Sequence, residues 1–252
     1  LTRDHLDHHH DMDSYFAAKA RLFTELLMHA GVAVINIDDP YGRKLAKIVR
    51  NDASKTPTPH VLVTLGFAED ADFRITNLTQ QQHITEFEIG RKEAKDSVKI
   101  SLNMPGRHNA LNATAAVAIA TDEGIRSEDI QNGIKKFSGV GRRFDVQGEF
   151  EVTGGTVMLI DDYGHHPTEV AATLRALREG WPDNRLVMVY QPHRYSRTKD
   201  LYEDFVEVLG EADVLLLLEV YSAGEKKIAS AGSRSLCRSI RLRGKVDPVY
   251  VK

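Results

Sequence analysis

The stretch TVMLIDDYGHHPTEV, residues 156–170, joins an apolar run to a cluster of titratable side chains and then to a proline. The apolar run predicts a strand at 156–161, and Pro167 begins a helix that Gly180 would end. Further strands and helices follow: strand 185–191 with helix 199–209, strand 213–220 with helix 233–243, and a last strand at 246–251. Strands that alternate with helices predict a parallel sheet with right-handed crossovers. We therefore expect a Rossmann-like α/β domain in which strands 156–161, 185–191 and 213–220 are adjacent and parallel.

In the first half of the chain the predicted strands and helices do not alternate regularly. Apolar spacing predicts a helix at 12–30, and the alanine-rich run that ends at Gly124 predicts another at 108–124. We expect strands at 32–37, 61–66, 73–77, 83–89 and 97–102, with 51–60 as a loop. We expect the boundary between two domains at GVGRRF (139–144), which gives a first domain over 1–141 and a second over 142–252.

Composition excludes several classes of protein. The 33 basic and 36 acidic residues give a net charge of −3, which argues against a general nucleic-acid binder. No apolar run approaches the length of a membrane span, and the first residues lack a signal peptide. Cys237 is the single cysteine, so no internal disulfide is possible. The motif GxGxxG is absent, so dinucleotide binding has no support. We expect a soluble, cytoplasmic protein.

Polar side chains follow three strands of the second domain, in DDYGHH (161–166), QPHRYSRT (191–198) and EVYSAGE (219–225). The carboxyl ends of parallel strands meet at one edge of a sheet, where ligands bind. One such loop alone reads equally well as ordinary polar loop residues, but three on one edge favour a cleft. Its predicted lining is Asp162, Tyr163, His165, His193, Arg194, Arg197 and Glu219. The two arginines suit a carboxylate or phosphate, hence an anionic substrate. His166 is left outside the site, as a cap or packing residue.

The first domain holds weaker signals. The opening RDHLDHHHDMDSYFAAK (3–19) is dense in imidazoles and carboxylates, which indicates a metal site. For His8, His9 and His10 we favour a solvated loop or a purification-tag remnant. Lys19 taken alone reads as an exposed lysine. Asn109 and Asn112 share one helix face, where amides can pair with a base edge, although alone this signal is weak.

Longer motifs resemble the Mur ligase family of peptidoglycan synthesis. From about residue 66 onward the likeness is to the type that joins L-alanine to UDP-N-acetylmuramate. The motifs are PGRHNALNATAAVAIA (105–120), GVGRRFD (139–145), DDYGHHPTEV (161–170), QPHRYSRT (191–198), LEVYSAGE (218–225), SRSLCRSI (233–240) and GKVDPV (244–249). The segments 1–23 and INIDDPYGR (35–43) are more similar to the third-step type, which adds diaminopimelate or lysine. The chain thus reads as a divergent homologue or as a recombined or designed sequence.

The resemblance implies part of a central ATPase domain over 1–141 and an amino-acid-binding Rossmann-like domain over 142–252. ATP would convert a substrate carboxylate into an acyl phosphate, which the amine of the amino acid attacks. His5 would bind Mg²⁺, and Lys19 would match a lysine that is carbamylated in the third-step type. Catalytic roles would also fall to His165 and His193. Asn109 and Asn112 would hold adenine, Arg143 the nucleotide phosphates and Asp162 the ribose. The muramoyl carboxylate and the amino acid would be bound by Tyr163, His165, His193, Arg194 and Arg197.

Two departures from the family pattern shape the expected activity. A Gly-rich phosphate loop ending in Gly-Lys-Thr or Gly-Lys-Ser occurs nowhere in the 252 residues, nor do the UDP-binding domain and the glutamate that shares the metal. Such a loop is the main stabiliser of a transferring phosphoryl group. We therefore expect an incomplete enzyme that lacks an N-terminal ligase segment and the last part of the C-terminal domain. The diaminopimelate signature Asp-Asn-Pro-Arg is also absent, which disfavours the third-step type. A non-catalytic nucleotide- or ligand-binding module is the other alternative.

Overall fold

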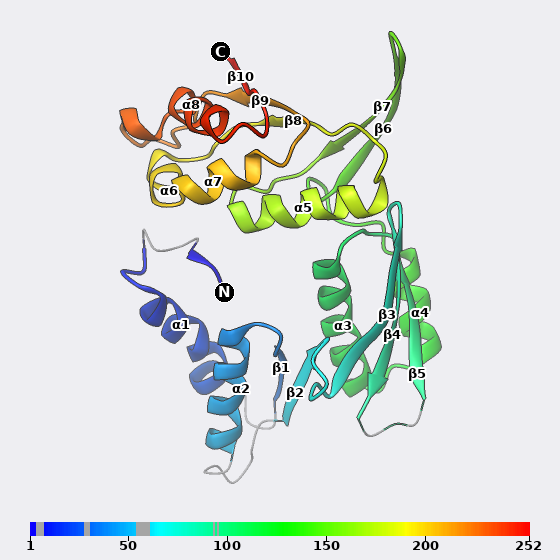
Figure 1. The fold of residues 1–252 in the computed structure, drawn as a ribbon. Coiled ribbons are helices and arrows are strands. Elements are labelled where there is room, and N and C mark those ends of the chain that lie inside the picture. The colour runs from blue at the N-terminus through cyan, green and yellow to red at the C-terminus, as the bar shows by residue number, and fades with distance from the viewer. Residues whose placement is uncertain (4–7, 28–30, 54–60, 93, 95) are drawn as a thin grey trace. The chain divides into compact units, whose positions relative to one another are not determined.

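The computed structural model describes residues 1–3, 8–27, 31–53, 61–92, 94 and 96–252. The chain forms two compact units, Leu1–Gly139 and Val140–Lys252. Both units combine helices and strands, as the sequence predicts (Figure 1). Within the described residues, none of the helices has the length and apolar character needed to cross a bilayer.

The first unit is built on a five-stranded sheet in the order β1-β2-β3-β4-β5. The strands are β1 (Val32–Asn36), β2 (Val61–Gly66), β3 (Phe73–Gln81), β4 (Ile84–Arg91) and β5 (Ser97–Leu102). The first three are parallel, and β4 runs antiparallel to both of its neighbours. All five strands were predicted from sequence, and the structure confirms them with ends shifted by a few residues.

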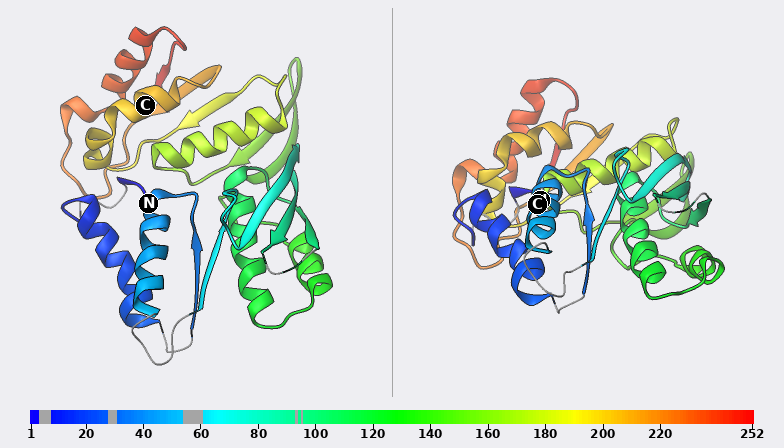
Figure 2. Two further views of the ribbon diagram at one scale, coloured as in Figure 1. Left: turned by 60° about the horizontal axis from the view of Figure 1, so that its bottom comes forward. Right: turned by 90° about the horizontal axis from the view of Figure 1, so that it is seen from below.

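Among the described residues, four helices cover this sheet, and the third of them packs against both its parallel and its antiparallel part. They are α1 (Met12–Arg21), which a π-helical turn extends over Leu22–Leu26, α2 (Pro40–Ala53), α3 (Arg107–Asp122) and α4 (Ser127–Lys136). Strands β1 and β2 lie between α2 on one side and α3 on the other (Figure 2). Phe16, Ile35 and Val49 centre one hydrophobic cluster, while Ile89 and Val117 belong to a second beneath β3–β5. Helices α2 and α4 were not predicted, and the predicted loop at 51–60 falls mostly outside the described residues.

The second unit contains a parallel sheet in the order β10-β9-β8. Its strands are β8 (Val187–Tyr190), β9 (Val214–Leu218) and β10 (Val249–Val251). The adjacent parallel pairing predicted for 185–191 and 213–220 is confirmed. The strand predicted at 156–161 is confirmed as β7 (Gly155–Asp161), but its predicted place in the parallel sheet was wrong. It pairs antiparallel with β6 (Asp145–Val152) in a separate two-stranded hairpin. The turn at Gly154 and Gly155, both with positive φ, favours this local partner over a distant one.

Helices pack on one face of the parallel sheet and form the core of the second unit. They are α5 (Pro167–Gly180), α7 (Tyr202–Leu209) and α8 (Ser233–Arg243), while the short α6 (Tyr195–Asp200) places Tyr195 in a separate small cluster with Val220 and Ala231. Leu215 and Leu217 of β9 are fully buried against Phe205 and Leu236. Burying side chains of this size contributes about 1.5–3 kcal/mol each. This core fixes the strand ends from which the polar loops emerge.

Candidate functional site

Four aromatic side chains form a row across three loops of the second unit. Tyr163 and His165 have ring centroids 5.2 Å apart, His165 and His193 6.2 Å, and His193 and Tyr221 5.2 Å. We call these four residues the ring row. The loops that carry them follow β7, β8 and β9. The structure therefore brings the three predicted loops together, and it adds Tyr221, which sequence reasoning had not named.

Asp162 holds the first of these loops in place. Its two carboxylate oxygens accept hydrogen bonds from the backbone N–H groups of Phe144 and Gly164, each at 2.8 Å. The Tyr163 N–H in turn donates to the Arg142 carbonyl at 2.7 Å. The Arg142 guanidinium lies over the Tyr163 ring, 4.6 Å from its centroid. Arg143, the predicted phosphate contact, is exposed on the same segment.

The start of α5 fixes His165. Glu169 accepts hydrogen bonds from the N–H groups of His165 and His166, both at 3.1 Å, while His166 Nδ1 accepts from the Thr168 N–H at 3.2 Å. This is a capping box, in which the side chains satisfy amides that a helix end leaves without partners. His165 Nδ1 lies 3.0 Å from the Tyr163 carbonyl, which orients the ring. His166 is buried and caps the helix, as the sequence predicted.

His193 and Arg197 meet at the second loop. Arg197 Nη1 lies 3.3 Å from both the Nδ1 and the carbonyl oxygen of His193. His193 also bridges to Tyr221 in parallel register, which continues the β8–β9 pairing beyond the strands. Partial burial, reinforced by the charge of Arg197, holds the pKa of His193 below its ordinary 6.5. His193 is therefore neutral at pH 7, with a basic nitrogen beside a cation.

Arg194 and Glu219 are placed differently from the ring row. Arg194 Nε donates to Glu225 Oε1 at 2.8 Å. Glu219, predicted to line the cleft, instead accepts from the Tyr250 hydroxyl at 3.1 Å and lies 3.8 Å from Lys227 Nζ. Burial of Glu219 opposes ionisation, but its hydrogen bonds prevail and lower its pKa. Glu219 thus connects the end of β9 to Tyr250 of β10.

The candidate residues of the first unit are dispersed. Lys19 is exposed, with Nζ 5.6 Å from the Tyr15 ring centroid, and lines a cavity of about 320 Å³ with Phe16, Phe23 and Leu45 among others. Asn109 is buried and donates to the Pro105 carbonyl at 2.8 Å, whereas Asn112 on the same helix is exposed.

The predicted metal ligand cannot be placed. His5 lies outside the described residues. Among the residues that the structure does describe, no group of three or more His, Cys, Asp or Glu could hold a metal ion.

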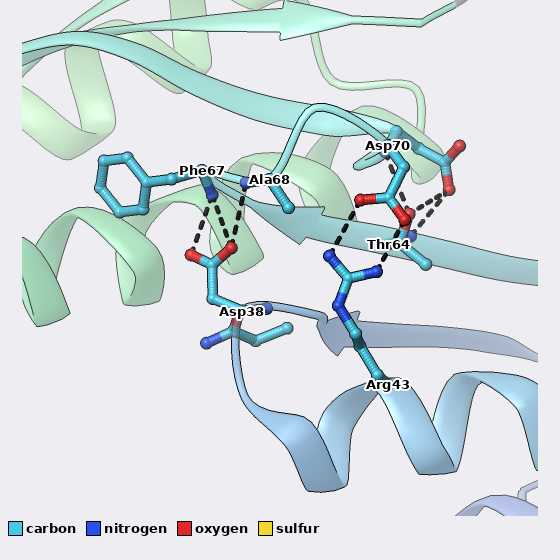
Figure 3. Close-up of polar contacts among 8 residues, drawn as sticks. Asp38, Arg43, Thr64, Phe67, Ala68 and Asp70 are labelled. Atoms are coloured by element: carbon cyan, nitrogen blue, oxygen red, sulfur yellow. Dashed lines mark hydrogen bonds and ion pairs between the residues drawn. The ribbon is translucent and has the colours of Figure 1, made fainter.

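Sequence reasoning missed a junction formed at the ends of β1 and β2. The Asp38 carboxylate accepts hydrogen bonds from the N–H groups of Phe67 and Ala68 at 2.9–3.0 Å (Figure 3). In the same view Arg43 of α2 makes a two-pronged ion pair with Asp70 at 2.7 and 3.0 Å. The Phe67 ring lies 3.2 Å beneath the Arg107 guanidinium at the start of α3. The acidic pair Asp38-Asp39 directly after a strand was the available signal.

Comparison with known proteins gives matches over most of the chain. The family model of the Mur ligase middle domain matches residues 1–120. The model described as Mur ligase, glutamate ligase domain matches residues 142–251. The two matched ranges correspond to the two units of the structure.

Several solved structures share the fold. UDP-N-acetylmuramate-alanine ligase MurC from Thermotoga maritima is 22% identical with a TM-score of 0.71, covering 99% of this chain and 49% of that chain. MurF from Acinetobacter baumannii is 19% identical with a TM-score of 0.70, covering 100% and 49%. MurF ligase from Thermotoga maritima in complex with ADP is 18% identical with a TM-score of 0.64, covering 98% and 55%. This chain thus spans about half the length of these proteins.

Proposed function

Because the chain belongs to the Mur ligase family of ATP-dependent amide ligases, we propose that it is part of a ligase that joins L-alanine to UDP-N-acetylmuramate. The observation that carries this proposal is the ring row, with Arg194 and Arg197 at the start of α6, directly after His193. Aromatic and imidazole groups beside guanidinium groups provide both anion binding and proton transfer. Such groups suit a reaction between a carboxylic acid, which guanidinium groups bind, and an amine, whose proton an imidazole accepts.

The proposed reaction forms one amide bond. ATP transfers its γ-phosphoryl group to the substrate carboxylate, the amine attacks the acyl phosphate, and inorganic phosphate leaves from the tetrahedral intermediate. Arg197 would bind a carboxylate beside His193. The neutral imidazole of His193 would accept the proton that the attacking amine loses, because its lowered pKa keeps it unprotonated at pH 7. Tyr163 and His165 would line the same substrate.

Nucleotide binding is proposed for residues of each unit. An ionised carboxylate has about four lone-pair positions. Asp162 uses two of them for the Phe144 and Gly164 amides, which leaves capacity for ribose hydroxyls. Asn109 donates to Pro105 through its amide nitrogen, so its oxygen would face adenine together with the exposed Asn112. The exposed Arg143 would approach the phosphates.

A Mg²⁺ site with His5 and a carbamylated Lys19 remains part of the proposal. Lys19 supports it because its side chain is exposed and lines a cavity, where a carbamate could form. The proposed domains are a central ATPase part over 1–141 and an amino-acid-binding part over 142–252.

L-alanine is the proposed amino acid because the motifs of the second unit resemble the alanine-adding type. A small, uncharged side chain needs no ion-pair partner of its own, and the diaminopimelate signature is absent. The competing proposal, the third-step reaction, rests on residues 1–43. Sequence identity does not favour either step, because the alanine ligase and a solved diaminopimelate ligase are both 22% identical to this chain, with TM-scores of 0.71 and 0.60.

The test joins this chain to a family segment that carries the Gly-rich phosphate loop. We expect phosphate release from ATP that requires both UDP-N-acetylmuramate and L-alanine, and that falls in His193→Ala. Faster turnover with meso-diaminopimelate on UDP-N-acetylmuramoyl-L-alanyl-D-glutamate would instead assign the third step. Nucleotide binding without any turnover would favour a non-catalytic module.

A further inference from the structure

The segment around helix α8 concentrates positive charge. Residues 226–246 contain seven basic residues and no acidic residue, in a chain whose net charge is −3. The seven are Lys226, Lys227, Arg234, Arg238, Arg241, Arg243 and Lys245. All of these side chains are exposed in the structure. We call residues 226–246 the basic segment.

The packing of α8 determines where this charge faces. The α8 residues that are buried in the core of the second unit are Leu236, Cys237 and Ile240. Arg234, Arg238 and Arg241 follow one another at intervals of four and three residues, which places them on one face of the helix. Leu242 lies next to Arg241 and is 82% exposed. The outer face of α8 therefore combines positive charge with an exposed apolar side chain.

The fold neutralises only part of this charge. The ion pairs are Arg241 with Asp247 at 2.6 Å, Arg243 with Glu203 at 2.6 Å, and Lys227 with Glu219 at 3.8 Å. Within residues 96–252, all of which the structure describes, no carboxylate forms an ion pair with Lys226, Arg234, Arg238 or Lys245. The Arg234 guanidinium lies 4.8 Å from the centroid of the Tyr250 ring, a contact that leaves its charge in place. Four positive charges of the basic segment thus have no counter-charge in this range.

We propose that the basic segment binds an anionic phospholipid surface. Clusters of about four to eight Lys or Arg residues on an amphipathic helix are typical of proteins that bind anionic lipids. The positive charges attract the lipid headgroups, and the exposed side chain of Leu242 enters the boundary between headgroups and acyl chains. Such a contact places the protein on a bilayer without crossing it. The inference does not depend on the proposed ligase reaction.

A nucleic acid is the other large polyanion that a basic segment could bind. Proteins that bind single strands stack the bases on aromatic side chains, and the basic segment contains no Phe, Tyr or Trp. Proteins that bind duplexes usually show a strong basic excess, whereas this chain is acidic overall. An exposed leucine beside the arginines adds to contact with lipid but not to contact with phosphate groups alone. These features favour a lipid surface.

Co-sedimentation of the 252-residue chain with lipid vesicles tests the proposal. The probes are vesicles of phosphatidylcholine alone and vesicles in which half of the lipid is phosphatidylglycerol. We expect binding to the anionic vesicles that falls steeply between about 0.05 and 0.5 M salt, because salt screens the charges. Binding to phosphatidylcholine alone should be weaker by about a hundredfold or more, since each basic side chain near an anionic surface contributes about fivefold.

Substitutions locate the contact on the basic segment. Arg238→Gln combined with Lys245→Gln should weaken binding to the anionic vesicles by about 25-fold, at about fivefold for each charge. The matched control is Lys135→Gln with Lys136→Gln, which removes two exposed charges from α4 and should leave binding nearly unchanged. Leu242→Ala should weaken binding by about tenfold at every salt concentration, as expected when about two methylene groups leave an apolar environment. The urea midpoint of each variant should equal that of the wild type, because all of these side chains are exposed.

Four results would overturn the proposal. The first three are equal binding to both kinds of vesicle, equal effects of the two double substitutions, and no measurable binding at the lower salt concentration. The fourth is binding of a DNA duplex as tight as that of the anionic vesicles, with no effect of Leu242→Ala on either. That result would assign the basic segment to nucleic acid instead.

Discussion

Replacement of Asp38 by alanine should loosen the junction between β1 and β2. Its carboxylate binds two backbone donors, the N–H groups of Phe67 and Ala68, at 2.9–3.0 Å. The geometry is that of a helix cap, whose removal costs about 0.5–2 kcal/mol. Because the Asp38 carboxylate accepts from two amides, we expect the upper part of this range, about 1–2 kcal/mol, which corresponds to a factor of about 5–30 in the opening equilibrium.

Amide hydrogen exchange measures this opening locally. The Phe67 and Ala68 amides should exchange about 5–30 times faster in Asp38→Ala, provided exchange follows local opening. Asp70→Ala is the matched control, since it removes an exposed ion pair with Arg43 and should leave both rates nearly unchanged. Equal acceleration in the two variants, or none in Asp38→Ala, would refute the role assigned to Asp38.

A second substitution extends the same reasoning. A Cβ added at Gly66, where φ is +155°, would lie 2.5 Å from Asp38 Oδ1. Gly66→Ala should therefore displace the carboxylate and destabilise the junction. In the Asp38→Ala background the steric part of this cost should disappear, so the two changes should be less than additive. Strict additivity in the same exchange measurement would show that the carboxylate and Gly66 do not interact.

Three other properties of the second unit can be measured directly. The imidazole of His193 should titrate below pH 6.5 in proton spectra, and Arg197→Ala should raise the pKa of His193. Between the lowered folded pKa and the unfolded pKa of 6.5, the unfolded chain binds more protons than the folded chain. His193 therefore contributes stability above pH 6.5 that is lost as the pH falls through the folded pKa. Arg178→Ala should cost about 1 kcal/mol in urea unfolding, because it removes a two-pronged but partly solvated pair with Asp213. The thiol of Cys237 should react slowly with a disulfide reagent in the folded chain, because burial raises its pKa; a rate equal to that in urea would contradict this.

The missed helix α2 shows where local sequence signals mislead. The stretch DDPYG reads as a turn, yet Asp39 Oδ1 accepts from the Tyr41 and Gly42 amides and Pro40 begins a helix. Glycine disfavours a helix, but a Cβ at Gly42 would overlap the Asn36 carbonyl oxygen. The glycine is thus required by close packing against the end of β1. Such a tertiary reason cannot be read from neighbouring residues in the sequence.

The structure contains the ring row although sequence analysis assigned β7, the strand before the loop of Tyr163 and His165, to the wrong sheet. The loops of His193 and Tyr221 follow from sequence, because β8 and β9 are parallel neighbours and their pairing continues to this bridge. The loop of Tyr163 and His165 has another origin, since β7 belongs to the hairpin.

That third loop is placed by helix α5 rather than by a sheet edge. Val170 and Leu174 of α5 share the buried core with Phe205 and Leu209 of α7, which anchors the helix. The capping box at its start then orients His165 towards His193. Pro167, which predicted the helix start, and Glu169, which sequence reasoning had not named, therefore determine the geometry of the row more than the strand pairing does. A helix start encoded within four residues is a local feature, whereas strand pairing depends on contacts between distant segments, and this is why the first was predicted correctly and the second was not.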